Sequence, residues 1–67
     1  MSNTVSGNIR KLRQEKGISQ DRLSKLADLA LNTVVKIETE ENSNPTVETL
    51  EKIAKAFGIS VAELFKK

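Results

Sequence analysis

Apolar residues recur every three or four positions along this chain, and residues that end helices interrupt them at short intervals. Val5, Ile9 and Leu12 form the first such row, and Gly17 follows it as a residue suited to the left-handed position just past a helix. No stretch alternates apolar and polar side chains as a half-buried strand does. The spacing therefore predicts an all-α fold of short helices with tight connections.

We expect a compact five-helix bundle in one domain, 1–67, with helices over roughly 5–16, 20–27, 31–38, 47–57 and 61–66. Ser19 and Thr46 stand where they can cap the second and fourth helices. Ser60 and Glu63 have the spacing of a capping box for the fifth. Asp28 follows the second helix, where aspartate tolerates a left-handed backbone.

Helices this short need one another's apolar faces, so we interpret each apolar row as core. The second helix is expected to bury Leu23, Leu26 and Ala27. The third is expected to bury Val34 and Ile37. The rows of the last two helices are Leu50, Ile53, Ala54 and Phe57, and then Val61, Leu64 and Phe65.

The chain has no cysteine and no histidine. This removes the Cys–His and Ser–His nucleophiles, the commonest proton shuttle and the usual zinc ligands. We therefore expect no catalytic residue, no metal, no cofactor and no enzymatic activity. No apolar run approaches the roughly 18 residues of a membrane span, and no signal-peptide pattern opens the chain. The expected location is the cytoplasm, with no membrane partner.

Positive charge is concentrated in the first half of the chain. Residues 1–36 hold seven Lys and Arg against three Asp and Glu, whereas residues 37–67 hold four against six. A basic half that contains a closely joined helix pair favours a polyanion as partner. Arg10, Lys11 and Lys25 lie in this half near the helix pair and are candidates for contact with the phosphates of such a partner.

Three stretches together resemble one known family: "IRKLRQEKGISQDRLSKLA", "TVVKIE" and "NPTVETLEKIAKAFGISVAEL". They resemble the Cro and phage-repressor type of helix-turn-helix domain, the XRE family, from about Val5 to Phe65. The resemblance implies a lambda-repressor-like fold that binds double-stranded DNA. It also implies that the helix over roughly residues 30–39 is the recognition helix.

The resemblance implies roles for particular residues. Gln20 and Thr33 would contact DNA phosphates, Thr33 from the first turn of the recognition helix. The expected base contacts are Ala30, Leu31, Asn32, Val35 and Lys36. Arg13 and Glu38 match a pair that commonly meets as a salt bridge between the first and third helices. The family often pairs through its C-terminal region, and we expect a homodimer interface of Ile59, Val61, Leu64 and Phe65, with the alternative that all four are core.

The sequence departs from the family pattern at four places. Asp28 replaces a turn glycine, and Ser24 replaces a small alanine, which is tolerable if its hydroxyl bonds back to the helix. After Glu38, the residues Thr39, Glu40 and Glu41 replace a less acidic loop that commonly approaches the DNA backbone. Leu31 replaces a residue that is usually polar.

The chemistry of the third helix suits base contact. Asn32 has the amide that pairs with adenine, Lys36 can reach guanine acceptors, and Leu31 can meet a thymine methyl group. We therefore predict a transcriptional regulator, a repressor or an activator, that binds a palindromic operator as a homodimer. The alternative is a protein-interaction module on the same fold, such as an antitoxin or a partner-controlled adaptor, which Leu31 and the acidic loop favour.

Overall fold

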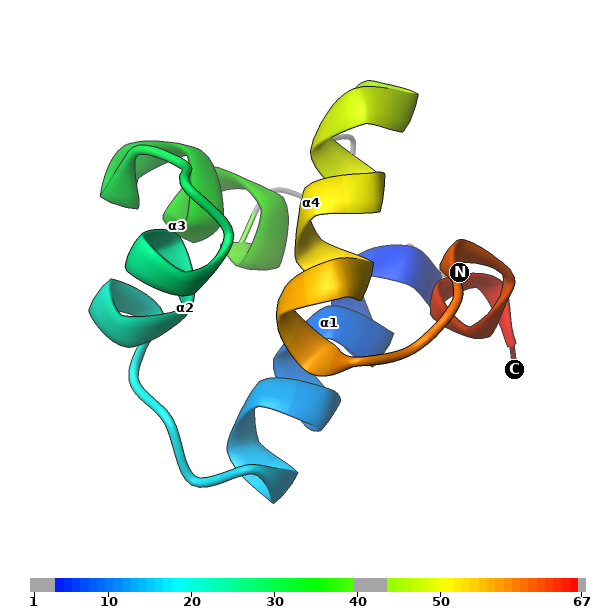
Figure 1. The fold of residues 1–67 in the computed structure, drawn as a ribbon, viewed down its shortest axis with the longest axis horizontal. Helices are drawn as coiled ribbons and strands as arrows, with labels where there is room; N and C mark the ends of the chain where they lie inside the picture. Colours follow the sequence, from blue (N-terminus) through cyan, green and yellow to red (C-terminus); the bar gives the residue numbers. More distant parts are fainter. Residues whose placement is uncertain (1–3, 40–43, 67) are drawn as a thin grey trace.

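The computed structural model describes residues 4–39 and 44–66. Four α-helices and one 3-10 helix follow one another along the chain (Figure 1). They are α1 (Thr4–Glu15), α2 (Gln20–Leu26), α3 (Leu31–Thr39), α4 (Val47–Phe57) and η1 (Val61–Phe65). The described residues contain no strand, so the predicted all-α class is confirmed. The fifth element is a 3-10 helix, however, and the expected fifth α-helix over 61–66 is wrong.

Side-chain hydrogen bonds cap the starts of α2 and α4, and a glycine closes α4. The Ser19 hydroxyl accepts a hydrogen bond from the Arg22 amide at 3.0 Å, and the Thr46 hydroxyl accepts one from the Thr49 amide at 3.1 Å. Both predicted N-caps are thus confirmed. Gly58 closes α4 with a left-handed φ of 73°, a conformation that glycine adopts without a steric penalty.

The predicted capping box of the last helix is wrong. The Ser60 side chain makes no capping hydrogen bond, and the Glu63 amide donates to the Ser60 carbonyl oxygen at 3.1 Å instead. That amide is the one the Ser60 hydroxyl would have capped. The tighter 3-10 turn has therefore already satisfied it through the backbone.

Asp28 and Ser24 allow a short connection between α2 and α3. Asp28 has a φ of 57°, the left-handed conformation expected for it. The Ser24 hydroxyl donates to the Asp21 carbonyl oxygen at 2.6 Å, so it bonds back to its own helix as predicted. The Leu29 amide then donates to the Ser24 carbonyl oxygen at 2.8 Å. These bonds fix the direction in which α3 leaves α2.

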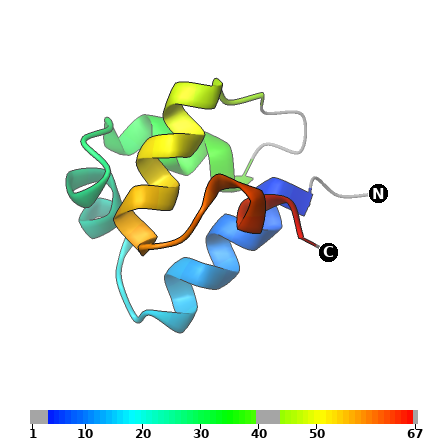
Figure 2. The same cartoon turned by 45° about the vertical axis from the view of Figure 1, so that its right-hand side comes forward.

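Every helix contributes one large, fully buried side chain to the core. These side chains are Ile9, Leu23, Val34, Ile53 and Leu64, one from each element in chain order. The short η1 contacts both α1 and α4 (Figure 2). No element can therefore be removed without exposing part of the same core.

Leu26 is not buried, which corrects the prediction for α2. It is 48% exposed, whereas Leu23, Ser24 and Ala27 are buried. On a helix these three share one side, and Leu26 lies about a quarter turn away from it. The serine at the α2–α3 crossing takes the inward position that the sequence pattern had given to the leucine.

No helix among the described residues is long and apolar enough to cross a membrane.

Candidate nucleic-acid interface

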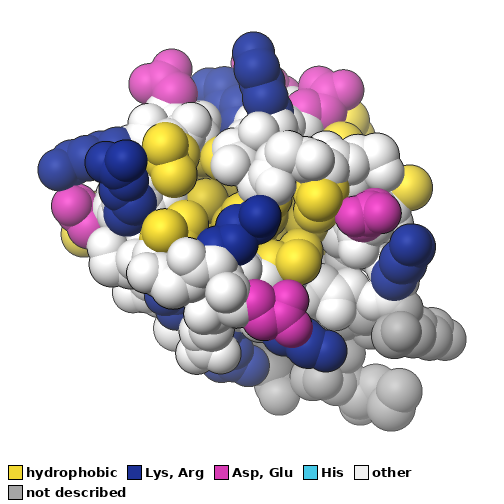
Figure 3. All heavy atoms as spheres, turned by 60° about the horizontal axis from the view of Figure 1, so that its bottom comes forward, with side chains coloured by type: hydrophobic (Ala, Val, Ile, Leu, Met, Phe, Trp, Pro, Cys, Tyr) yellow, Lys and Arg dark blue, Asp and Glu magenta, His cyan; other side chains and the backbone are white. Residues whose placement is uncertain are grey.

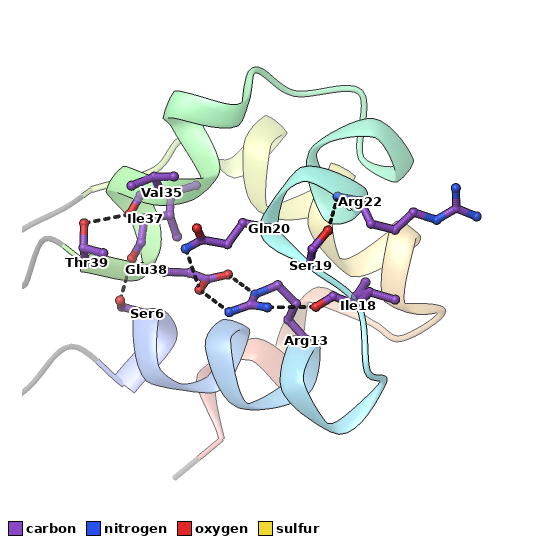
Figure 4. A network of polar contacts seen from close by, with 10 residues as sticks. All are labelled: Ser6, Arg13, Ile18, Ser19, Gln20, Arg22, Val35, Ile37, Glu38 and Thr39. Carbon is purple, nitrogen blue, oxygen red and sulfur yellow. Dashed lines mark hydrogen bonds and ion pairs between the residues drawn. The ribbon is translucent and has the colours of Figure 1, made fainter.

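A buried ion pair joins α1 to α3. Arg13 Nε donates to Glu38 Oε2 at 2.7 Å, and Arg13 Nη2 donates to Glu38 Oε1 at 3.0 Å (Figure 4). The Glu38 side chain is 1% exposed and the Arg13 side chain 14%. This bidentate geometry is the strongest arrangement available to an arginine and a carboxylate. The structure thus brings together the two residues expected to meet.

The same carboxylate also holds the start of α2. Gln20 Nε2 donates to Glu38 Oε1 at 3.1 Å (Figure 4). Arg13 Nη1 donates to the Ile18 carbonyl oxygen at 2.8 Å, and the Ser6 hydroxyl donates to the Ile37 carbonyl oxygen at 2.5 Å. One polar network therefore fixes the C-terminal half of α3 to α1 and to the first residue of α2.

The opposite side of α3 faces solvent and carries two rows of side chains. Asn32 and Lys36 lie one turn apart and are exposed. Leu31, 43% exposed, and the half-buried Val35 form a parallel row beside them. Val34, Ile37 and Glu38 point inward and anchor the helix. The outward face therefore offers an amide, an ammonium group and an apolar strip on a fixed support.

The residues expected at phosphates lie at different places around α3. Arg10 is exposed on the side of α1 that also holds Ser6 and Arg13, the two residues bonded to α3. Lys25 is exposed and forms an ion pair with Asp21 at 3.2 Å, and such a pair is weak enough to exchange partners. Gln20 has turned its amide toward Glu38 but keeps one amide hydrogen available.

Lys11 lies on another side of α1. It lines a hollow between α1 and η1 together with Asn8, Leu12, Glu15, Glu63 and Lys66. Asn8 marks this side of the helix, because its amide donates to the carbonyl oxygens of Leu64, at 2.9 Å, and of Lys66. The structure therefore separates Lys11 from the helix pair, and we leave it out of the interface proposed below.

A hollow adjoins the outward face of α3 and was missed in the sequence. It is lined by Thr33, Lys36, Ile37, Asn44, Pro45, Thr46 and Thr49. Thr33 and Lys36 come from α3, and Thr46 caps α4. Thr46 could have been found from its capping position, which brings its hydroxyl to the end of a helix. Its nearness to Lys36 depends on how α4 packs, and sequence spacing does not show that.

A family comparison shows whether the α2–α3 pair belongs to a known architecture. Residues 9–64 match the family model described as helix-turn-helix, which spans every described helix from the core of α1 to η1.

The chain belongs to the XRE type of helix-turn-helix protein.

Similar helix-turn-helix proteins are named as transcriptional regulators. The HTH-type transcriptional regulator PuuR of Escherichia coli (strain K12) is 36% identical over 56 residues, which cover 84% of this chain and 30% of PuuR. The cryptic phage CTXphi transcriptional repressor RstR of Vibrio cholerae is 37% identical over 59 residues, or 88% of this chain and 52% of RstR. The chain thus spans about half or less of the length of these two relatives.

A solved structure has the same helix-turn-helix fold over nearly its whole length. The restriction-modification controller protein C.AhdI from Aeromonas hydrophila superposes with a TM-score of 0.85 at 32% identity, with 92% of each chain covered. The fold of this chain is therefore also that of this controller protein.

The C-terminal part of this helix-turn-helix protein differs from the expected dimer surface. Leu64 is 0% exposed and belongs to the core, because η1 must bury it to close the bundle. That corrects its assignment to an interface. Ile59 and Val61 are half-buried against the core, and Phe65 is 52% exposed. Only Phe65 of the four presents a large apolar surface.

The acidic loop falls partly outside the described residues, since Glu40 and Glu41 are not among them. Within the described part of the chain no three acidic side chains gather as a metal site would need.

Proposed function

We propose that this protein binds double-stranded DNA sequence-specifically through α3, as a homodimeric transcriptional regulator on a palindromic operator, without catalysing a reaction. One observation supports this most strongly. The outward face of α3 presents Asn32 and Lys36 beside Leu31 and Val35, while its inner face is held by the core and the Arg13–Glu38 pair. A rigid helix with base-recognising side chains on one face suits the major groove.

Different side chains of α3 suit different bases. The amide of Asn32 can donate to and accept from adenine, and the ammonium group of Lys36 can donate to guanine. Leu31 and Val35 can contact thymine methyl groups. Ala30, exposed just before α3, offers the same kind of apolar contact on a smaller scale.

Phosphate contacts flank this face and supply affinity that does not depend on sequence. We assign them to Arg10, Gln20, Lys25 and Thr33. Thr46 and Thr49 border the hollow beside Lys36. The Thr46 hydroxyl donates to the Thr49 hydroxyl at 3.0 Å, and the Thr49 hydroxyl can in turn donate to the same backbone. One copy of α3 covers only a half-site, so two copies about one helical turn apart are needed for useful specificity.

The phosphate assignment predicts a difference between two neighbouring basic residues. Arg10→Gln should weaken binding to all DNA sequences about equally and flatten the salt dependence of the binding constant by about one unit per protomer. Lys11→Gln, on the η1 side of α1, is the matched control and should leave the slope unchanged. Fluorescence anisotropy over a series of salt concentrations measures both. Equal slopes for the two variants would place Arg10 outside the interface.

The dimer assignment predicts that Phe65 matters more than another exposed apolar residue. Burial of a phenylalanine is worth about 1.5 to 3 kcal/mol, and a twofold interface loses it twice. Phe65→Glu should therefore raise the dimer dissociation constant about tenfold or more, as measured by analytical ultracentrifugation with and without DNA. Val47→Glu, at a side chain that is 68% exposed on α4, is the control. A wild-type monomer that binds each operator as a single copy would contradict the dimer.

The position of Leu31 tests whether α3 lies in the major groove. Leu31→Ala should lower operator affinity by about 1 kcal/mol, the low end for a base contact, and should leave non-specific binding and its salt dependence intact. Replacing the contacted thymine with uracil, which lacks the methyl group, should have the same effect, and the two losses should not add. If Leu31→Ala leaves operator binding unchanged and abolishes association with a protein, α3 serves a protein interface instead.

A further inference from the structure

A second surface lies between the C-terminal ends of α2 and α4, and no role in DNA binding accounts for it. Six residues line this groove: Leu26, Ala27, Asp28, Lys52, Lys55 and Ala56. Its volume is about 480 Å³, compared with about 300 Å³ for the hollow beside Lys36. The space is therefore large enough to receive side chains from another molecule.

The groove has an apolar floor. Leu26 is 48% exposed, although other residues of the same helix, Leu23 and Ser24, are buried. Ala27 and Ala56 lie beside it, and both are small enough to leave the space open. A single exposed leucine is ordinary on any protein surface. Leu26 differs from such a residue because it lies in a hollow beside two alanines, and another apolar side chain can fill that hollow.

The rim of the groove is positively charged. Lys52 and Lys55 form no ion pair with any residue that the structure describes, whereas Lys25 and Lys66 are paired with Asp21 and Glu63. Asp28 is the single carboxylate in the lining. Figure 3 shows one face of the molecule, on which hydrophobic side chains lie next to both basic and acidic ones. Two unpaired ammonium groups beside an apolar floor complement a surface that is apolar and acidic.

The groove is separate from the proposed DNA interface. None of its six residues belongs to the outward face of α3 or to the assigned phosphate contacts. It also lies at the other end of α4 from the hollow that adjoins Lys36. An occupant of the groove would therefore not displace DNA from α3.

We propose that this groove docks an acidic amphipathic helix of a partner protein. Apolar side chains of that helix would pack on Leu26 and Ala56, and its carboxylates would pair with Lys52 and Lys55. A helix laid in a groove between two helices is a common way to recognise such a segment. Because the groove leaves α3 free, the regulator would hold the partner and DNA at the same time.

Two synthetic helical peptides test the proposal on the full 67-residue chain. The first has leucines at helical i, i+4 and i+7 positions with glutamates flanking them, and the second has lysines in place of the glutamates. Binding is followed by amide NMR shifts of the labelled protein. The acidic peptide should shift the amides of Leu26, Ala27, Lys52, Lys55 and Ala56, and the basic peptide should not bind there.

Variants in the groove separate charge from apolar contact. Lys52→Glu combined with Lys55→Glu should reverse the preference, so that the basic peptide binds the groove and the acidic one does not. Leu26→Ala should weaken the acidic peptide about fivefold, since roughly half of a leucine is available for further burial. Leu31→Ala, an equally exposed leucine on α3, is the matched control and should not change peptide affinity. Thermal melts show that each variant is folded.

Several results would overturn the proposal. Equal binding of both peptides would mean that the groove is only an apolar patch. Shifts confined to α3 would mean that the acidic peptide imitates DNA on the basic face. Shifts at Leu26 and Lys55 on raising the concentration of the protein alone would identify the occupant as a second copy. The same shifts with duplex DNA would make the groove part of the nucleic-acid interface.

Discussion

Replacing Arg13 with methionine is expected to lower the free energy of unfolding by about 3 to 5 kcal/mol, because the change leaves a buried carboxylate without its charged partner. The Glu38 side chain is 1% exposed and accepts three hydrogen bonds, two of them from Arg13. A domain of this length has a total stability of about 3 to 10 kcal/mol. The variant should therefore lose a large share of the domain's stability, and urea or thermal melts followed by circular dichroism measure the loss.

Three further variants show that the loss comes from the buried charge. Arg10→Met removes an exposed arginine from the same helix and should cost little. Arg13→Met combined with Glu38→Leu should recover much of the stability, since a buried ion pair can be replaced by apolar side chains of similar size. Glu38→Gln keeps an acceptor for Arg13 and should lie between wild type and Arg13→Met. If Arg13→Met melts like Arg10→Met, the ion pair does not hold the fold.

The second large effect is expected at Asn32. Asn32→Ala should reduce affinity for the operator by about 1 to 3 kcal/mol, because a bidentate contact with adenine would be lost. Binding to unrelated DNA should stay the same, since the phosphate contacts remain. Competition between operator and unrelated duplexes in a gel-shift assay measures the ratio of specific to non-specific affinity. Gln14→Ala removes an exposed amide from α1 and is the matched control.

A general fall in affinity for all sequences would place Asn32 at the DNA backbone. No fall for any sequence would remove α3 from the interface.

The Arg13–Glu38 pair was implied by the family resemblance. The other features predicted correctly at the helix ends and the α2–α3 joint depend on neighbouring residues. The caps at Ser19 and Thr46, the left-handed Asp28 and the back-bonded Ser24 each involve groups within a few positions of one another. Such arrangements follow from the chemistry of one turn of chain. They were therefore visible before the helices were placed in space.

The features that the sequence missed depend on how the helices pack. Leu26 fits the apolar spacing of α2, but the crossing with α3 gives the inward place to Ser24. Leu64 was expected either in the core or at a dimer interface, and the structure buries it fully because a bundle this small needs it to complete the core. Lys11 and Arg10 are adjacent in sequence, yet a helix turns them about 100° apart, so only one shares the side that meets α3.

The hydrogen bond from Gln20 to Glu38 is another feature that depends on how the helices pack. The family resemblance implied a phosphate contact for Gln20, and its amide also bonds the carboxylate that holds α1 to α3. A side chain that is already positioned loses less entropy on binding. The structure therefore adds a support to the proposed phosphate contact that the spacing of the residues did not show.

Selection of bound sequences from a pool of random duplex DNA tests the central proposal most directly. With the wild-type protein, the account predicts enrichment of a palindromic motif whose half-sites lie about one helical turn apart. With Asn32→Ala, the same spacing should be enriched, with relaxed preference at one adenine in each half-site. Recovery of random sequences, or of a motif that Asn32→Ala and Leu31→Ala both leave unchanged, would contradict base recognition by α3.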